Sequence, residues 1–254
     1  MIIMDKGTSN MIANCELKGN ATFPTAGIVL NKGTCIIKET TVEGFSKGGI
    51  LMWLEDPNIC KIFTTKIEYC KNAGIQIMGA SQSPIIEFCT IKNNSAPGIQ
   101  ICTGNSCQIR KNTILNNQDG IEVISGDPTI FSNQISRNNH NGIITRAIED
   151  LICQPKVHMN EISSNRYNGI NCVGFNNLTR IEENKISFNK LAGAKVDQEA
   201  SIIIMKNEIF KNIHQGILVC ERASAHMELN SVSENIKSNI AFGGEGLVFL
   251  VHSK

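Results

Sequence analysis

The sequence predicts an all-β solenoid of about ten coils, with three short strands in each coil. Three observations lead to this prediction. A motif of the form N-x-I-x-x-N-x-x-x-G-I-x-V recurs at intervals in the low twenties, and it is clearest at residues 206–219, KNEIFKNIHQGILV. Apolar residues, mostly Ile, follow three regular ladders, and Asn and Gly stand between them. β-branched residues favour strands whereas Asn and Gly favour turns, so each coil reads as three strands joined by tight corners.

The three ladders define the coil. The first is Ile12, Ile37, Ile62, Ile86, Ile109, Ile130, Val157, Ile181, Ile204 and Met227. The second, five residues further on each time, is Leu17, Val42, Ile67, Ile91, Ile114, Ile135, Ile162, Ile186, Ile209 and Val232. The third is Ile3, Ile28, Ile50, Ile75, Ile99, Ile121, Ile143, Ile170, Ala194, Ile217 and Ile240. Within the third strand the apolar residues alternate, as in Ile75 and Ile77, so they are expected to face inward and stack into a continuous core.

Two columns of Asn accompany the ladders. One follows the first ladder by three residues (Asn112, Asn133, Asn160, Asn184, Asn207, Asn230), and one follows the second (Asn20, Asn94, Asn117, Asn138, Asn165, Asn189, Asn212, Asn235). Asn tolerates the left-handed conformation of a tight turn, and stacked Asn amides can also bond to each other along the axis. The residue before each third-ladder position is usually Gly, with Asn239 in the last coil, which suggests a positive φ there.

These repeats resemble those of the right-handed parallel β-helix, in its carbohydrate-binding and sugar-hydrolase type. The segment Asn72 to Pro84, NAGIQIMGASQSP, is similar to repeats of F-box-only ubiquitin-ligase receptors and, more loosely, of Shc-binding proteins. The resemblance implies a right-handed, single-stranded parallel β-helix over residues 1–254 as one domain. It also implies a substrate-recognition module for ubiquitylation, although no F-box-like helical segment or zinc-finger pattern is present.

Composition and charge argue against nucleic acid and membranes as partners. A net charge of +1 and few aromatic residues argue against nucleic acid as a partner, and no apolar run is long enough to span a membrane. The start, MIIMDKGTSN, is unlike a secretory signal, and the ten Cys residues form no C-x-x-C motif, so a reducing, cytoplasmic location is expected. Cys35 and Cys60 are expected to stack in adjacent coils. No cofactor or metal is expected, because no His completes a metal pattern near Cys102 and Cys107.

The spacing between ladders indicates where contacts form. The first two ladders are always five residues apart, whereas the third-to-first interval varies from 9 to 14, so one edge carries nearly all insertions. Loops on a rigid scaffold commonly carry binding residues. The candidate binding residues at this edge are Trp53, Glu55, Asp56, Arg146, Glu149 and Asp150. Since the chain starts and stops in mid-coil, its open ends are expected either to pack on other proteins or to continue in a longer polypeptide.

The resemblance also raises catalysis, since β-helix proteins include pectate lyases, polygalacturonases and uronate epimerases. Their chemistry needs clustered carboxylates, often with Ca²⁺, and a Lys or Arg beside them. The six Asp residues occupy dissimilar repeat positions, and the strongest cluster is Asp127 with Glu149 and Asp150. The preferred interpretation is therefore a non-catalytic protein-binding or scaffold module of a large intracellular assembly. The alternative is a polysaccharide lyase, hydrolase or epimerase.

Overall fold

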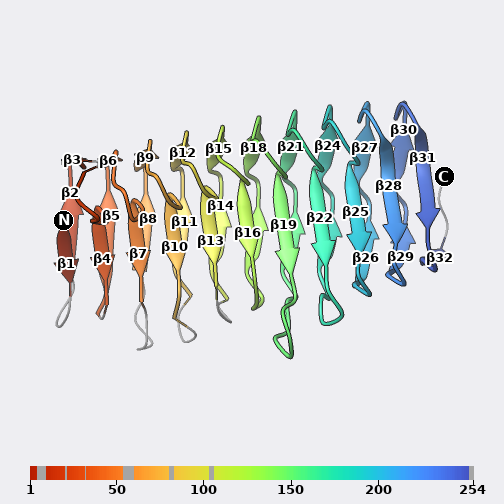
Figure 1. Ribbon diagram of the computed structural model, residues 1–254, viewed down its shortest axis with the longest axis horizontal. Coiled ribbons are helices and arrows are strands. Elements are labelled where there is room, and N and C mark those ends of the chain that lie inside the picture. The colour runs from red at the N-terminus through yellow and green to blue at the C-terminus, as the bar shows by residue number, and fades with distance from the viewer. Residues whose placement is uncertain are drawn as a thin grey trace.

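Three parallel sheets wind around a single hydrophobic core in the computed structural model. The structure describes residues 1–4, 10–20, 22–31, 33–53, 60–79, 83–102 and 106–251, and it describes residues 249–251 by their backbone only. Each complete coil contributes one strand to each sheet, and every described strand pair is parallel. We call the sheets that begin with β1, β2 and β3 sheets A, B and C. Figure 1 looks onto sheet A and shows the coils stacked side by side from the N-terminus to the C-terminus. The predicted all-β solenoid of about ten coils is confirmed.

The strands are short, and those of each sheet follow one another in space in the order of the chain. Sheet A contains β1 (Ile2–Met4), β4 (Ile28–Leu30), β7 (Ile50–Met52), β10 (Ile75–Ile77), β13 (Ile99–Ile101), β16 (Ile121–Val123), β19 (Ile143–Arg146), β22 (Ile170–Val173), β25 (Ala194–Asp197), β28 (Gln215–Cys220) and β31 (Ser238–Gly243). Sheet B contains β2 (Asn10–Ala13), β5 (Cys35–Lys38), β8 (Cys60–Phe63), β11 (Ile85–Glu87), β14 (Gln108–Arg110), β17 (Thr129–Phe131), β20 (Lys156–His158), β23 (Arg180–Glu182), β26 (Ser201–Met205), β29 (Ser224–Glu228) and β32 (Leu247–Val251). Sheet C contains β3 (Glu16–Lys18), β6 (Thr41–Glu43), β9 (Lys66–Glu68), β12 (Thr90–Lys92), β15 (Thr113–Leu115), β18 (Gln134–Ser136), β21 (Glu161–Ser163), β24 (Lys185–Ser187), β27 (Glu208–Phe210) and β30 (Ser231–Ser233).

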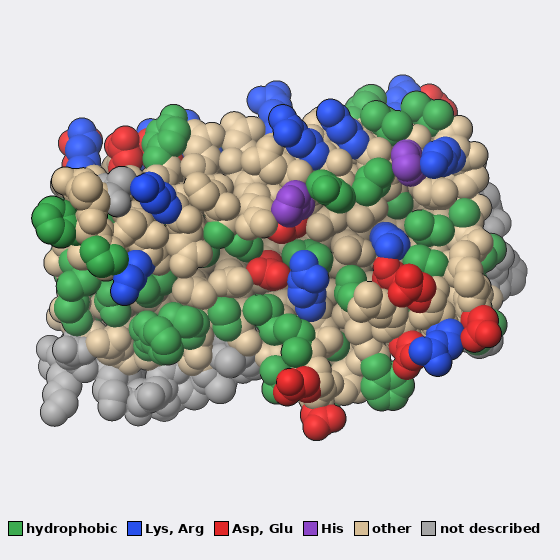
Figure 2. Space-filling model, viewed as in Figure 1, with side chains coloured by type: hydrophobic (Ala, Val, Ile, Leu, Met, Phe, Trp, Pro, Cys, Tyr) green, Lys and Arg blue, Asp and Glu red, His purple; other side chains and the backbone are tan. Residues whose placement is uncertain are grey.

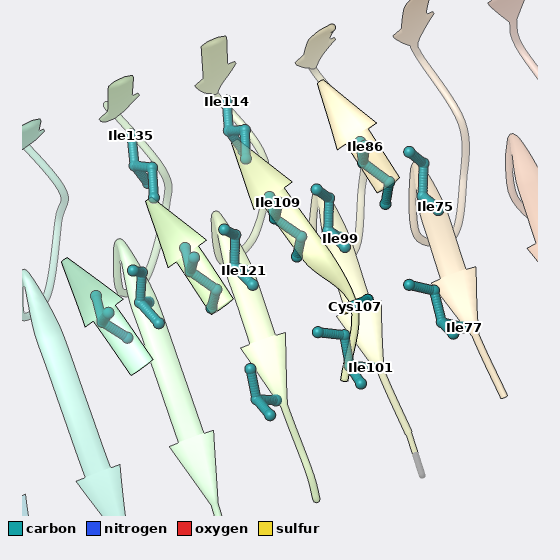
Figure 3. Packing of buried hydrophobic residues seen from close by; sticks show 14 of the residues in the cluster. Ile75, Ile77, Ile86, Ile99, Ile101, Cys107, Ile109, Ile114, Ile121 and Ile135 are labelled. Carbon is teal, nitrogen blue, oxygen red and sulfur yellow. The ribbon is translucent and has the colours of Figure 1, made fainter. Parts of the chain in front are cut away.

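The apolar ladders run in register from coil to coil. Ile75 pairs with Ile99, Ile86 with Ile109, and Ile91 with Ile114, and all of these side chains are buried. Figure 3 shows inward-pointing Ile side chains, each stacked on the Ile of the next coil. Burial of a continuous column is how a solenoid made of short strands gains stability.

One position of the third ladder is wrong. Ile2, not Ile3, pairs with Ile28, and Ile3 is half exposed. A shift of one residue moves a side chain to the other face of a strand. No Gly precedes this Ile to mark the register, because Met1 stands there, and two consecutive Ile residues leave the choice open.

The Asn columns act through their side chains rather than their backbone conformation. The residues with φ near +55° are the ones before each Asn, such as Ser132, Met159 and Glu183, so the left-handed conformation predicted for the Asn is wrong by one position. The Asn133 backbone N–H donates to Asn160 Oδ1 at 2.9 Å, and Asn133 Nδ2 donates to the same oxygen at 2.9 Å. These bonds recur between coils in both columns, which confirms the predicted stacking of Asn amides along the axis. Asn20 lies outside its column, since it is exposed and accepts from Thr22 N.

The repeated Gly before the third ladder is needed for space. None of the column (Gly27, Gly49, Gly74, Gly98, Gly120, Gly142, Gly169, Gly193, Gly216) has the predicted positive φ. A Cβ on Gly169 would lie 2.6 Å from the Gly193 carbonyl oxygen, 2.5 Å from Ile186 Cγ2 and 2.9 Å from Asn189 Nδ2. Asn239 takes this place on β31, the last strand of sheet A in the described part of the chain, where no following coil presents a carbonyl oxygen.

The corners differ in length as the ladder spacing predicted. Two residues separate each sheet B strand from the following sheet C strand in every coil, whereas the connections from sheet A to sheet B vary. Figure 1 shows the long loops gathered at the end of the sheet A strands, with the loop after β19 projecting farthest. All ten Cys are free thiols, including the stacked pair Cys35 and Cys60, and burial raises the pKa of the Cys35 thiol to about 12. Across the described ranges, no helix is long and apolar enough to cross a membrane.

Candidate functional site

The predicted edge residues lie on two surfaces, the outer face of sheet A and the loops between sheets A and B. Trp53 follows β7 and is 50% exposed, with its backbone N–H bonded to the Leu30 carbonyl. Arg146 ends β19 and lies on the outer face of sheet A, where its Nε is 3.1 Å from Glu122 Oε1. Glu149 and Asp150 lie in the loop that follows. The predicted Glu55 and Asp56 fall outside the described residues. A protein interface built from these side chains stays a prediction.

The predicted acidic cluster is brought together in part. Asp127 and Asp150 line one depression of about 440 Å³ at the variable edge, together with Ser125 and Gln154. Asp127 Oδ1 already accepts a 2.5 Å bond from Ser106 Oγ. Glu149 is not among the lining residues, and its backbone takes a left-handed turn. No group of three or more His, Cys, Asp or Glu side chains is arranged for a metal ion among the residues whose placement is described.

A larger polar array lies on the middle and C-terminal part of the outer face of sheet A. In β1 to β25 the sheet A strands have inward side chains at their first and third positions, so the second and fourth positions point outward, and in the longer β28 and β31 the inward positions are the third and fifth. In the middle and C-terminal coils the position between the two inward residues holds Gln76, Gln100, Glu122, Asn171 and Lys195, with Ile144, Leu218 and Ala241 as exceptions. Figure 2 shows acidic, basic and histidine side chains interspersed over this part of the face.

The first part of the array is a hydrogen-bonded row across four coils. Gln76 Nε2 donates to Gln100 Oε1 at 2.7 Å, and Gln100 Nε2 donates to Glu122 Oε2 at 2.8 Å. Glu122 Oε1 then accepts from Arg146 Nε. Amide and charged groups are therefore linked along the solenoid axis, and each bond fixes the next side chain.

The second part is a charged pair at the end of β25. Lys195 Nζ and Asp197 Oδ2 form a close ion pair, and Cys220 Sγ lies 3.3 Å from Asp197 Oδ1. Burial opposes ionisation of Asp197, but Lys195 and Cys220 outweigh it, so the pKa of that carboxyl is lowered. Burial likewise opposes the charge of Lys195, but Asp197 outweighs it and the pKa of the ammonium is raised. Burial first, and then the Asp197 carboxylate, raises the pKa of the Cys220 thiol to about 11.

The third part lies along the corner that leads into sheet A. Asp119 Oδ1 accepts from the backbone N–H and from Nδ2 of Asn141, and Asn141 Oδ1 accepts from Asn168 Nδ2 at 3.1 Å. His140 Nδ1 is 3.6 Å from Asp119 Oδ2, and its ring meets the Tyr167 ring edge-on at 5.0 Å. The carboxylate thus lies near an imidazole that contacts a phenol.

The second and third parts meet at a depression of about 480 Å³ on sheet A. Its lining side chains are Asn141, Tyr167, Asn168, Asn171, Leu191, Ala192, Lys195, His214, Gln215 and Leu218. Asn171 Oδ1 is buried there with no hydrogen-bond partner among the described residues. A phenol, an imidazole and an ammonium group therefore border one recess beside an acceptor that has no protein donor. We call this recess the sheet A depression.

The repeat pattern does not predict the sheet A depression. His140 and His214 occupy equivalent repeat positions three coils apart, and the backbone bonds through Tyr167 and Leu191 place them at that separation, which is too far for one metal ion. The signal that points to the site is the residue between the two inward apolar positions of each third strand. Read as a column, Gln76, Gln100, Glu122, Asn171 and Lys195 are polar in segments that are otherwise apolar, and Ile144 and Leu218 interrupt the column.

A family model described as "Right handed beta helix region" matches residues 1–152, which is more than half of the chain. The chain belongs to the right-handed β-helix family. The repeat family and the handedness predicted from the sequence are therefore confirmed. A search of curated protein sequences gives no significant match for this β-helix protein.

Solved structures share the whole coil arrangement. A mutant of the periplasmic alginate epimerase AlgG has a TM-score of 0.77 at 17% identity, over 89% of this chain and 61% of the epimerase. The A-module of the Azotobacter vinelandii mannuronan C-5 epimerase AlgE4 has a TM-score of 0.63 at 12% identity, over 99% of this chain and 79% of the module. Pectate lyase Pel9A has a TM-score of 0.57 at 12% identity, with the same coverage. The chain thus spans less than two thirds of the AlgG mutant, and at these identities the likeness establishes the fold.

The comparisons correct the functional expectation. The interpretation as a non-catalytic protein-binding scaffold, and the prediction that the chain is not an enzyme, are wrong on these findings, because the structural neighbours are epimerases and a lyase. No comparison links the chain to F-box-only receptors or Shc-binding proteins, so the ubiquitin-ligase resemblance is not supported. Clustered carboxylates are the mark of catalysis that the sequence led us to expect, whereas the polar side chains lining the sheet A depression are amide, Lys, Tyr and His.

Proposed function

We propose that this β-helix protein is a carbohydrate-active enzyme that acts on uronate-containing polysaccharides by removing the proton next to the sugar carboxylate. The observation that carries the proposal is the sheet A depression, where Lys195, Tyr167 and His214 converge beside the unpartnered Asn171 Oδ1. The epimerases and the lyase with the same fold give it independent support, since their names specify alginate, mannuronan and pectate.

The cations of the face suit a sugar carboxylate. Asp197 occupies one position around the Lys195 ammonium, which has three donors in all. Arg146 uses its Nε for Glu122, and a guanidinium has five N–H donors. Both groups therefore retain donors for a substrate anion. A cation at the carboxylate also stabilises the negative charge that develops there when the neighbouring carbon loses its proton.

Tyr167 and the two His side chains suit proton transfer. Tyr167 borders the depression and contacts His140, whose Nδ1 is 3.6 Å from Asp119 Oδ2, while His214 lines the same recess. A phenol and an imidazole can remove a proton on one side of a sugar ring and return one to the ring or to the leaving oxygen. Return to the carbon gives epimerisation, and departure of the glycosidic oxygen gives elimination.

Hydrolysis fits the face less well. It uses two carboxyl groups that flank the glycosidic bond, one as acid and one as base or nucleophile. The carboxylates described on this face, Asp119, Glu122 and Asp197, each have protein partners: the Asn141 amide, the Arg146 guanidinium and the Lys195 ammonium. Ionised carboxylates held by donors are poor proton donors.

The test is an activity screen on mannuronan, alginate and pectate. Elimination is followed by the ultraviolet absorbance of the unsaturated sugar, epimerisation by proton NMR of the polymer, and hydrolysis by new reducing ends without unsaturation. We expect elimination or epimerisation of at least one uronan, and a loss of about a hundredfold in kcat/KM on Tyr167→Phe or Lys195→Ala. Lys190→Ala is the matched control, since Lys190 lies exposed at a corner of the same coil. Inactivity on every uronan, or equal loss in the control variant, would overturn the proposal.

A further inference from the structure

The N-terminal part of the same face is apolar. The outward positions of its strands hold Val29 on β4 and Leu51 on β7, and Trp53 and Met78 occupy the fourth positions of two adjacent coils. Figure 2 shows hydrophobic side chains gathered over these coils. Trp53 is half exposed, and it is the only Trp in the chain. A planar aromatic ring thus stands on the outer face next to a small apolar area.

The row of polar side chains runs from this area toward the sheet A depression. Gln76 lies on β10, the neighbour of β7 in sheet A. A row of hydrogen bonds leads from Gln76 through Gln100 and Glu122 to Arg146 on β19. β25, which carries Lys195, is six coils beyond β7 in the order β7-β10-β13-β16-β19-β22-β25. At ~4.8 Å per coil the separation along the axis is roughly 29 Å. Side chains able to bond sugar hydroxyls therefore extend over the distance between the two areas.

We propose that Trp53, with Leu51 and Met78, forms a distal subsite on which a sugar of the same polysaccharide chain stacks. This inference rests on the proposed function, because the occupant is the chain whose reacting unit lies in the sheet A depression. A pyranose ring presents C–H groups on one face, and these pack on an indole, while its hydroxyls face outward. A hexopyranose in an extended chain is about as long as one coil is thick, so about seven sugar units would span the two areas.

The geometry therefore implies a preference for long substrates. A tetrasaccharide bound at the depression ends before it reaches Trp53, whereas a dodecasaccharide or a polymer covers both areas. The apolar area explains why the subsite would stack a ring rather than bind a carboxylate, since Val29, Leu51 and Met78 supply no charge.

The single Trp gives a direct measurement. Emission of Trp53 is recorded in the Tyr167→Phe variant, which slows turnover, during titration with a uronan tetrasaccharide, a dodecasaccharide and the polymer. We expect a change in emission with the dodecasaccharide and the polymer but not with the tetrasaccharide. In the otherwise unaltered protein, Trp53→Ala should raise KM for the polymer about three- to tenfold and leave kcat/KM for the tetrasaccharide unchanged. Trp53→Phe should restore most of the lost affinity, since a ring remains.

Phe88→Ala is the matched control, because Phe88 is an exposed aromatic residue at the corner between sheets B and C, away from sheet A. Thermal midpoints of all variants check that the fold is retained. Equal effects of Trp53→Ala on short and long substrates, or turnover with silent Trp53 emission, would overturn the distal subsite while the proposed function stands. A length-dependent emission change without conversion of any uronan would support the subsite and overturn the proposed reaction. With neither conversion nor emission change, both proposals fail.

Discussion

The corner between sheets B and C has the same length in every coil, whereas the edge between sheets A and B varies in length. Both turn the chain from one strand to the next. The corner does so with two residues in every coil, and where the second is a buried Asn, it bonds to the coil before and the coil after. The edge varies in length and presents exposed loops such as the one around Asp150. The difference teaches that length is fixed where a buried side chain completes the backbone hydrogen bonds, and free where water can complete them.

A matched pair of insertions is the strongest test of this comparison. Inserting Gly-Ser-Gly after Met159, in the corner, should lower the free energy of unfolding by about 4 kcal/mol or more, because it separates Asn160 from its partners in both neighbouring coils. The same insertion after Glu149, at the edge, should change it by less than about 0.6 kcal/mol. Urea denaturation followed by circular dichroism measures both. Comparable losses at the two sites would refute the comparison.

Gly169→Ala tests the space available at the corner that leads from sheet C into sheet A. The new Cβ would lie within 2.6 Å of both the Gly193 carbonyl oxygen and Ile186 Cγ2, so the stacked coils must separate locally. We expect a loss of about 3 kcal/mol in the free energy of unfolding. Arg166→Ala, in the exposed part of the same corner, serves as control and should stay within about 0.5 kcal/mol. A neutral Gly169→Ala would show that the corner can relax.

Asn160→Ala removes one member of the ladder without adding volume. The Asn133 N–H loses its acceptor, and the Ile130 carbonyl loses its donor. A buried group left unpaired costs about 1–3 kcal/mol, so a loss of about 2 kcal/mol is expected. Asn176→Ala, at the variable edge, should stay within about 0.5 kcal/mol in the same chemical denaturation. Equal losses for the two Asn residues would mean that the ladder adds nothing specific.

Asp197→Asn changes the last residue of β25, where sheet A meets the variable edge. We expect it to change the free energy of unfolding less than the three destabilising changes described above. The lowered pKa of Asp197 means that its stabilisation is present above the ordinary pKa of 3.8 and disappears as pH falls through the folded value. The raised pKa of Lys195 means that its stabilisation is present below 10.5 and disappears as pH rises through the folded value. The difference in the free energy of unfolding between wild type and variant, followed by urea denaturation as a function of pH, should thus be widest between those limits, at about 1 kcal/mol or less since water partly screens the pair. Glu16→Gln, in an exposed pair with Lys18, is the control that should show no such window.

The fold could be predicted from the sequence because it depends on inward residues that repeat. Ile62, Ile86 and Ile109 occupy equivalent places, so one coil predicts the next. The cause of a repeated residue is harder to predict. The pattern suggests positive φ at Gly169, but the reason is a carbonyl 2.6 Å away in the next coil, and it suggests positive φ at Asn160, but Met159 adopts that conformation. A one-dimensional pattern shows that a position is constrained, but not whether the constraint is conformational or steric.

The candidate site depends on residues that do not repeat. Tyr167 and Lys195 are 28 positions apart in sequence, yet both border the sheet A depression because their coils stack. Outward positions are free to differ from coil to coil, so no periodicity marks them. Arg146 is a candidate because of its place in an insertion, but the structure sets it against Glu122 on sheet A, and it does not line the depression that Asp150 borders.

The left-handed residue at each corner has a consequence for how such a protein can change. The coils place varied side chains there, among them Thr64, Phe88, Lys111, Met159 and Glu183, so the conformation is imposed by the coil and not by the residue type. Their side chains project at the regular spacing of the stack, about 4.8 Å. Evolution or a protein engineer can therefore rewrite this row one position at a time, placing charges, aromatic rings or attachment points at known intervals along a rigid rod.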